Sequence, residues 1–170
     1  SQQDLYVISD EIYGKLIYDE FKFKSFASLT QEIKKRTIIL DGVSKSYAMT
    51  GWRIGYAVGP KEIINGIKKI QSHSTSNPCS IAQIAAVEAL MGPQEEQKKM
   101  IEEFKRRRNY LITKFAVIKD ISCYKPNGSF YLFPNVSAYY NREYNGKLIR
   151  NSYELAYYLL KEGRVALVPG

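Results

Sequence analysis

The sequence has 170 residues, of which 45% are hydrophobic and 25% are charged, and its formal net charge is +8. This length and composition predict a soluble globular protein and exclude a disordered tail. The positive charges are spread over predicted helices without a nucleic-acid-binding motif, so we expect no nucleic-acid partner. The longest apolar stretches are only strand-sized, so we expect no membrane-spanning helix and no membrane partner.

Two cysteines, Cys79 and Cys123, and one histidine, His73, are the only residues of these types. The cysteines lie far apart in the sequence, which favours neither a disulfide framework nor a zinc knuckle. A single histidine offers metal catalysis almost no ligands, so we expect no metal. No basic and then apolar leader opens the chain, and we therefore expect a cytoplasmic protein.

The first part of the chain alternates predicted strands with a helix. Residues 5–10 form an apolar run that ends in an acid, which is typical of a buried strand. Ser28 is expected to cap a short helix through 32–35, and 37–40 is a second buried strand. A third strand covers 53–58 and stops at a Gly-Pro pair. Strands separated by helices predict an α/β layer.

Three helices are predicted in the middle of the chain. Isoleucines at helical spacing follow Lys61, and a largely apolar helix covers 81–90. The third helix is long and charged, and its apolar face lies opposite most of the basic run 105–108. We interpret this run as a solvated helix face rather than a binding patch.

A different pattern begins after Asp120. Short strands are predicted over 121–124 and 129–133, separated by a Pro-Asn-Gly turn. Ser152 is expected to cap another helix, and 165–168 is predicted to be the last strand. We therefore expect a second, smaller unit in this part of the chain.

Two ionisable residues follow the first two predicted strands. Asp10 ends the first strand, and Lys45 comes within a turn of the end of the second. Ligands of α/β sheets bind beyond the carboxyl ends of the strands, so both residues occupy a ligand-binding position. An acid and a lysine in such positions can also form a plain ion pair, and these two residues alone leave both interpretations open.

The run over residues 42–55, Gly-Val-Ser-Lys-Ser-Tyr-Ala-Met-Thr-Gly-Trp-Arg-Ile-Gly, adds specific information. It resembles the lysine motif of the class I and II aminotransferases that use pyridoxal 5'-phosphate (PLP), with Lys45 as the lysine and Arg53 as the arginine eight residues later. Within residues 10–13, Asp10 and Tyr13 resemble an aspartate and a tyrosine that lie three residues apart in this family. The resemblance continues as far as Tyr131 and therefore covers most of the chain.

The resemblance implies a role for each matching residue toward PLP. Lys45 is expected to hold the cofactor as an imine and to move the α-proton of the substrate. Asp10 would hold the protonated ring nitrogen, which lets the ring take up electrons. Tyr13 would donate a hydrogen bond to the ring oxygen, and the planar fork of Arg53 would bind the phosphate.

Two further features concern the phosphate and the partner subunit. Many relatives supply a phosphate-binding hydroxyl three residues before the lysine, where this sequence has Gly42. Ser44 is our candidate for replacing that hydroxyl. In the family, the loop that matches 74–78 lies close to the active site of the partner subunit in a homodimer, although a serine-rich loop needs no such role.

The family also implies a fold and an activity. We expect residues 1–104 to be the last part of a PLP fold type I large domain and residues 105–170 to belong to a smaller α+β domain. Family members are more than twice as long, so the chain resembles a C-terminal fragment that is itself inactive. The motif favours the branch of bacterial aspartate aminotransferases, which convert aspartate and 2-oxoglutarate to oxaloacetate and glutamate.

Other activities stay open at this point. Within the same fold, aromatic or alanine transamination and a carbon-sulfur lyase reaction are alternatives, because the residues that select the substrate lie outside this chain. An alternative from another class is a noncatalytic α/β interaction fragment. All the enzymatic alternatives share an amino acid substrate and PLP, and the transaminases among them also share a 2-oxo acid.

Overall fold

The computed structural model describes residues 5–170, which form two compact units. The first unit extends to Glu103 and also contains Asn127–Ser129. The second consists of Phe104–Pro126 and Phe130–Gly170. The return of a short segment to the first unit was not predicted from the sequence. That these units correspond to the large and small domains of a PLP enzyme stays a prediction.

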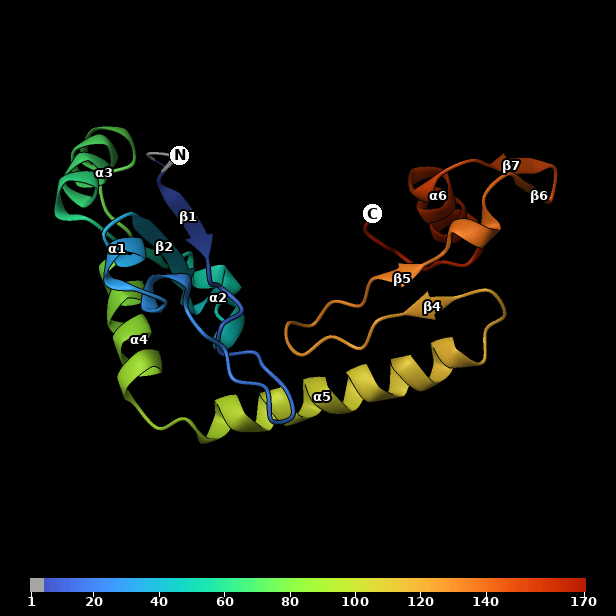
Figure 1. Ribbon diagram of the computed structural model, residues 1–170, viewed down its shortest axis with the longest axis horizontal. Helices are drawn as coiled ribbons and strands as arrows, with labels where there is room; N and C mark the ends of the chain where they lie inside the picture. Colours follow the sequence, from blue (N-terminus) through green and yellow to red (C-terminus); the bar gives the residue numbers. More distant parts are fainter. Residues whose placement is uncertain (1–4) are drawn as a thin grey trace. The chain divides into compact units, whose positions relative to one another are not determined.

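The main sheet of the first unit has three strands (Figure 1). They are β1 (Val7–Asp10), β2 (Thr37–Gly42) and β3 (Gly55–Val58), in the order β1-β2-β3. β1 and β2 are parallel, whereas β2 and β3 are antiparallel. The ends of β1 and β2 and the beginning of β3 therefore lie at the same edge of the sheet, and the predicted mixed α/β character is confirmed.

β1 is less buried than the sequence predicts. Ile8 is 70% exposed, and Leu5 and Tyr6, which precede the strand, are exposed as well. β1 is an outer strand of the sheet, and among residues 5–170 no strand pairs with its other side. Exposed large apolar side chains of this kind are typical of regions that contact further protein.

The helices of the first unit begin where the local sequence allows. Thr30, rather than Ser28, caps the first α-helix, because its hydroxyl accepts a hydrogen bond from the Ile33 N–H at 3.1 Å. The predicted cap at Ser28 is therefore wrong. The two longer predicted helices are confirmed. The elements are η1 (Phe26–Ser28), α1 (Gln31–Lys34), α2 (Val43–Ser46), η2 (Thr50–Trp52), α3 (Lys61–Ser74) and α4 (Ser80–Met91).

A small apolar core joins α4 to the segment after β2. Its buried members are Val43, Ile54, Ala82 and Ala86, and Tyr47 packs against them. The alanines of α4 have short side chains, which lets the helix approach α2 closely. This core fixes the turn that carries Lys45 against a rigid helix.

The long charged helix is α5 (Glu95–Ala116), and it is confirmed. One residue of its basic run differs from the prediction, since Arg108 is only 4% exposed. Its guanidinium donates a hydrogen bond to the Pro126 carbonyl oxygen at 2.8 Å. The interpretation of the run as a solvated face is therefore wrong for Arg108, which satisfies a backbone carbonyl instead.

The predicted strand over 129–133 is wrong. Residues 127–129 instead lie beside residues 16–18, because the Ser129 N–H donates to the Leu16 carbonyl and the Tyr18 N–H donates to the Asn127 carbonyl, both at 2.8 Å. The strand that pairs with β4 therefore begins later. The short strands of the second unit are β4 (Ser122–Cys123), β5 (Pro134–Asn135), β6 (Arg142–Tyr144) and β7 (Lys147–Ile149).

The end of the chain also differs from the prediction. The last helix, α6 (Ser152–Glu162), is capped by Asn151, whose side chain accepts a hydrogen bond from the Glu154 N–H at 3.0 Å. The predicted cap at Ser152 is therefore wrong. Residues 165–168 form no strand in the described structure. Among residues 5–170, no helix is long and apolar enough to cross a membrane.

Candidate cofactor site

Asp10 lies at the end of β1, where it is adjacent to Leu40 of β2. Its Oδ1 accepts a hydrogen bond from the Ile12 N–H at 3.2 Å, which starts a turn directly after the strand. The carboxylate is exposed, and because it can accept about four hydrogen bonds, the turn leaves it capacity for a ligand. The local sequence thus presents an anion beyond the end of the strand.

Tyr13 lies in the turn that follows. The Gly14 N–H donates to the Glu11 carbonyl at 2.7 Å, and the Leu16 N–H donates to the Tyr13 carbonyl at 2.9 Å. Leu16 is completely buried, so it anchors the end of this turn. The half-buried Tyr13 is therefore held on a backbone with defined hydrogen bonds.

Glu11 is a structural residue of this site that sequence reasoning missed. Its Oε1 accepts hydrogen bonds from the hydroxyls of Ser9 and Ser25, at 3.1 and 2.8 Å, and from the Phe26 N–H at 3.1 Å. A carboxylate with several donors is strongly held. Glu11 therefore ties the loop before α1 to the turn beside Asp10. Its position directly after Asp10 was the only available signal.

Lys45 lies in α2, the short helix that directly follows β2. The Val43 and Ser46 side chains of this helix are buried, whereas Ser44 and Lys45 are half-buried. The Tyr47 N–H donates to the Val43 carbonyl at 3.2 Å and closes the helical turn. One face of α2 thus packs into the core, and Lys45 has a fixed backbone at the edge of the sheet.

Gly42 precedes α2 and lies opposite Gly55 of β3. A Cβ atom at position 42 would lie 2.8 Å from the Ile54 carbonyl oxygen and 3.0 Å from the Gly55 Cα. The close approach of the two strands therefore requires glycine here. In this structure, the spacing leaves no room for a hydroxyl-bearing side chain at position 42. Ser44 stays the proposed replacement.

Gly42→Ala tests this packing. The substitution is expected to lower the free energy of unfolding by about 1–3 kcal/mol, because the strand backbones must move apart. Urea denaturation provides the measurement. Gly66→Ala is the matched control, since a Cβ there meets nothing within 4 Å on α3, and it should instead stabilise the helix by about 1 kcal/mol. Equal effects of the two substitutions would contradict the close-packing explanation.

Arg53 lies between η2 and β3, in a left-handed backbone conformation with φ 56° and ψ 43°. Such a conformation costs a non-glycine residue about 1–3 kcal/mol and is often found at functional sites. Its Nη1 donates to the Thr50 carbonyl at 2.8 Å, and the side chain is exposed. The buried Ile54 anchors the following residue. Arg53 is thus held in a tight turn at the beginning of β3.

The strand register explains how these residues come to share one edge of the sheet. Asp10 ends β1, Lys45 follows β2, and Arg53 precedes β3, which runs in the opposite direction. Figure 1 shows α2 beyond the arrowhead of β1. The edge therefore combines a carboxylate, an amine and a guanidinium. Such a set can bind an anion and react with a carbonyl compound.

A second acid lies at the same edge, although sequence reasoning did not single it out. Asp41 and Tyr56 are directly opposite each other in β2 and β3. The Tyr56 hydroxyl donates to Asp41 Oδ2 at 3.0 Å, and the Gly42 N–H donates to Asp41 Oδ1 at 2.7 Å. Burial, this hydrogen bond and the negative charge of Asp41 raise the pKa of Tyr56 to about 12.

The raised pKa predicts a stability change at alkaline pH. Because the folded-state pKa of about 12 exceeds the ordinary 10.0, the contribution of Tyr56 is complete below pH 10 and is lost as the pH rises toward 12. Urea denaturation at several pH values should show that wild type and Tyr56→Phe converge over this range. A difference that stays constant up to pH 12 would contradict the Asp41 hydrogen bond.

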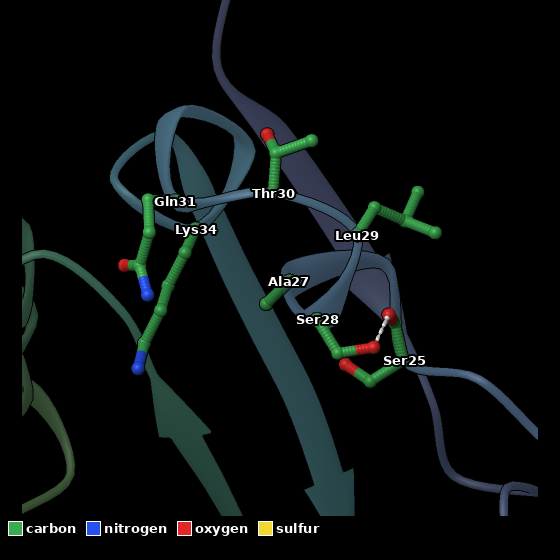
Figure 2. A pocket seen from close by; sticks show the side chains of 7 residues that line it. All are labelled: Ser25, Ala27, Ser28, Leu29, Thr30, Gln31 and Lys34. Carbon is green, nitrogen blue, oxygen red and sulfur yellow. Dashed lines mark hydrogen bonds between the residues drawn. The ribbon is translucent and has the colours of Figure 1, made fainter.

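Two surface cavities lie elsewhere. One, of about 490 Å³, follows the connection between β1 and β2, and Figure 2 shows the Ser28 hydroxyl bonded to the Ser25 carbonyl within it. The other, of about 470 Å³, lies in the second unit between β7 and α6. Neither is lined by Asp10, Lys45 or Arg53. Among residues 5–170, no cluster of three His, Cys, Asp or Glu side chains could hold a metal.

Comparison with known proteins identifies the class to which this lysine-containing α/β structure belongs. The family model described as aminotransferase class I and II matches residues 1–170. The chain therefore belongs to the class I and II aminotransferase family.

The relatives include proteins named as aspartate and aromatic aminotransferases. The chain is 50% identical to an aspartate aminotransferase of Geobacillus stearothermophilus. The alignment spans 165 residues, which are 96% of this chain and 41% of the relative. The crystal structure of the aspartate aminotransferase from Rhizobium meliloti matches 96% of this chain and 41% of its own, with a TM-score of 0.90 and 41% identity. An aromatic aminotransferase structure from Pyrococcus horikoshii matches with a TM-score of 0.84 and 38% identity, over 98% of this chain and 42% of its own. The chain thus spans about two fifths of the length of these relatives.

Proposed function

We propose that this chain is part of a PLP-dependent aminotransferase that transfers the amino group of aspartate to 2-oxoglutarate. The observation that carries the proposal is the lysine turn between β2 and β3, with Asp10 and Arg53 at the same edge of the sheet. The 50% identity to an aspartate aminotransferase supports the choice of substrate.

The donor set at this edge fits PLP. The Lys45 amine suits the aldehyde of the cofactor, and the Arg53 guanidinium suits its phosphate. Asp10 supplies the carboxylate for the ring nitrogen, with its own turn contact using only part of its accepting capacity. Tyr13 supplies a phenol for the ring oxygen, and Ser44 a hydroxyl for the phosphate. These five residues are our proposed cofactor site.

Once bound, PLP supplies an electron sink that makes loss of the substrate α-proton possible. Lys45 has two tasks in this proposal. Its Nζ would hold the cofactor in the resting enzyme, and the same amine, once free, would accept and return the α-proton of the substrate. Asp10 would keep the ring nitrogen protonated by accepting its hydrogen bond. Both tasks of Lys45 depend on the fixed backbone of α2.

Surface composition supports the proposal that the chain belongs to a longer protein. Ile81, Ile84 and Met91 of α4 are 70%, 72% and 83% exposed, and the outer side of β1 is also apolar. Large apolar side chains exposed to this extent are typical of surfaces that contact further protein. We infer that further segments of the parent enzyme, and its second subunit in a homodimer, cover this surface. A cytoplasmic location stays a prediction.

The test is an assay of the full-length protein with PLP, aspartate and 2-oxoglutarate. We expect glutamate and oxaloacetate to form, with a kcat in the ordinary enzymatic range of about 1–10³ s⁻¹. The kcat/KM values for phenylalanine and alanine should be lower than that for aspartate. A higher value for phenylalanine would instead favour the aromatic activity. Release of a thiol, pyruvate and ammonia from an S-substituted cysteine, without a 2-oxo acid acceptor, would favour the carbon-sulfur lyase.

The 170-residue chain itself should be assayed in parallel. We expect it to produce no glutamate from the same mixture, because it spans only about two fifths of the relatives. Glutamate formation by this chain would overturn the proposal that the site needs further segments. If the full-length protein is also inactive and binds no PLP, the noncatalytic interaction fragment becomes the better interpretation.

A further inference from the structure

The hydroxyl of Tyr47 lies between two segments of the candidate site. The Lys15 Nζ donates to the Tyr47 Oη at 2.6 Å and lies 5.1 Å from the centre of its ring. The Tyr47 hydroxyl in turn donates to Gln94 Oε1 at 3.0 Å. Lys15 follows Tyr13 by two residues, and Tyr47 follows Lys45 by two residues. One phenol thus joins the Tyr13 turn to the Lys45 turn.

Two members of this chain of hydrogen bonds, Tyr47 and Gln94, are anchored. The Tyr47 ring packs against the core of Val43, Ile54, Ala82 and Ala86, so its hydroxyl has a fixed position. The Gln94 amide donates to two backbone carbonyls between α4 and α5, those of Ala89 at 3.0 Å and Gly92 at 2.7 Å. These two hydrogen bonds orient the side-chain oxygen of Gln94 toward Tyr47. A tyrosine that only filled the core would need one polar partner for its hydroxyl, whereas Tyr47 has two, on separate segments.

We propose that Tyr47 is a positioning residue, whose hydroxyl fixes the Tyr13 turn relative to Lys45 through Lys15 and Gln94. This inference rests on the proposed function, because it assigns the purpose of the contact to the PLP site. Backbone hydrogen bonds hold each turn separately, with the Leu16 N–H on the Tyr13 carbonyl and the Tyr47 N–H on the Val43 carbonyl. The Lys15–Tyr47 contact connects the two turns through side chains.

The physical reason is the precision that a cofactor site requires. Tyr13 and Lys45 are to contact the same cofactor, so their separation must be held within a fraction of an ångström. They lie on different connections, one after β1 and the other after β2. The sheet fixes the strand ends, but each turn could still tilt. Lys15 and Tyr47 each lie two residues after a functional side chain, so a contact between them prevents one turn from tilting relative to the other.

The test is a double-mutant cycle in the full-length protein with Tyr47→Phe and Lys15→Met. Lys15→Met is expected to weaken PLP binding about fivefold, which corresponds to the loss of one ordinary hydrogen bond. Tyr47→Phe should weaken it at least as much, because it also removes the hydrogen bond to Gln94. The double variant should bind PLP no more weakly than Tyr47→Phe, because both substitutions remove the same Lys15–Tyr47 contact. The visible circular dichroism of bound PLP should change in all three variants. Additive effects or an unchanged spectrum would overturn the proposal.

Tyr18→Phe is the matched control. Tyr18 is a buried tyrosine of the same unit, and its hydroxyl donates to the Ser129 carbonyl rather than to the lysine turn. We expect lower stability but an unchanged PLP spectrum. A spectrum that changes as much as in Tyr47→Phe would show that any lost tyrosine hydroxyl has this effect, and would overturn the specific role of Tyr47.

A second readout separates this inference from the proposed function. In the cofactor-free protein, hydrogen exchange at the Leu16 and Tyr47 amides should accelerate together in Tyr47→Phe and in Lys15→Met. If wild type binds no PLP, the proposed function fails, yet this measurement still decides whether the two turns are coupled. Exchange that accelerates only at Tyr47 would overturn the coupling.

Discussion

Lys45→Ala in the full-length protein is expected to abolish covalent attachment of PLP and to lower kcat by on the order of 10⁴-fold. The reason is that one amine performs both attachment and proton transfer in the proposed site. Borohydride reduction followed by mass spectrometry measures the attachment, because reduction makes the lysine bond permanent. The assay with aspartate and 2-oxoglutarate measures kcat, and the visible absorbance of bound PLP gives a third readout.

Lys34→Ala is the control for loss of a lysine. Lys34 lies in α1, on the connection before β2, and lines the cavity of Figure 2 rather than the lysine turn. We expect this variant to keep both the cofactor mass and the activity. Undiminished activity of Lys45→Ala, or attachment of PLP to another lysine, would refute the assignment of Lys45.

The parts of the fold that the sequence predicted depend on local patterns. β2 and α4 are continuous apolar segments with clear ends, and the helical spacing of isoleucines after Lys61 gives α3. The lysine motif is likewise a run of adjacent residues, so its position between two strands could be inferred without knowing their register. Patterns of this kind predict a helix or a strand from adjacent residues alone, without knowledge of the segments that pack against it.

The errors concern segments whose partners are distant in the sequence. Residues 129–133 have the composition of a strand, but the backbone before them bonds to residues 16–18 instead. The apolar residues 165–168 find no strand partner within the described structure. A strand forms only if another backbone satisfies its hydrogen bonds, and composition does not specify that backbone.

The same limit applies to the supporting residues of the site. Glu11 acquires its importance from Ser25 and Phe26, which follow it by more than a dozen residues. Asp41 meets Tyr56 only because β2 and β3 are paired in one register. Local motifs therefore identified the side chains proposed to contact PLP, whereas the residues that hold them in place became visible only with the strand pairing.

Asp10→Asn should separate attachment from electron withdrawal. We expect Lys45 still to attach PLP in this variant, while kcat falls by about 10²–10³-fold, because a neutral amide no longer keeps the ring nitrogen protonated. The carboxylate lies beyond the end of β1 with Oδ1 on the Ile12 N–H, and the asparagine side-chain oxygen can accept that same hydrogen bond. The fold should therefore survive. Mass spectrometry after reduction and the transamination assay measure the two effects independently.

Glu20→Gln is the control for removing one negative charge from the exposed surface of the same unit, and it should leave kcat unchanged. Comparison with Lys45→Ala is equally informative, because that variant loses attachment and activity together whereas Asp10→Asn should lose activity alone. If Asp10→Asn retained full kcat, the ring nitrogen would have another partner. If it lost PLP attachment as completely as Lys45→Ala, Asp10 would act in binding the cofactor rather than in drawing electrons from the substrate.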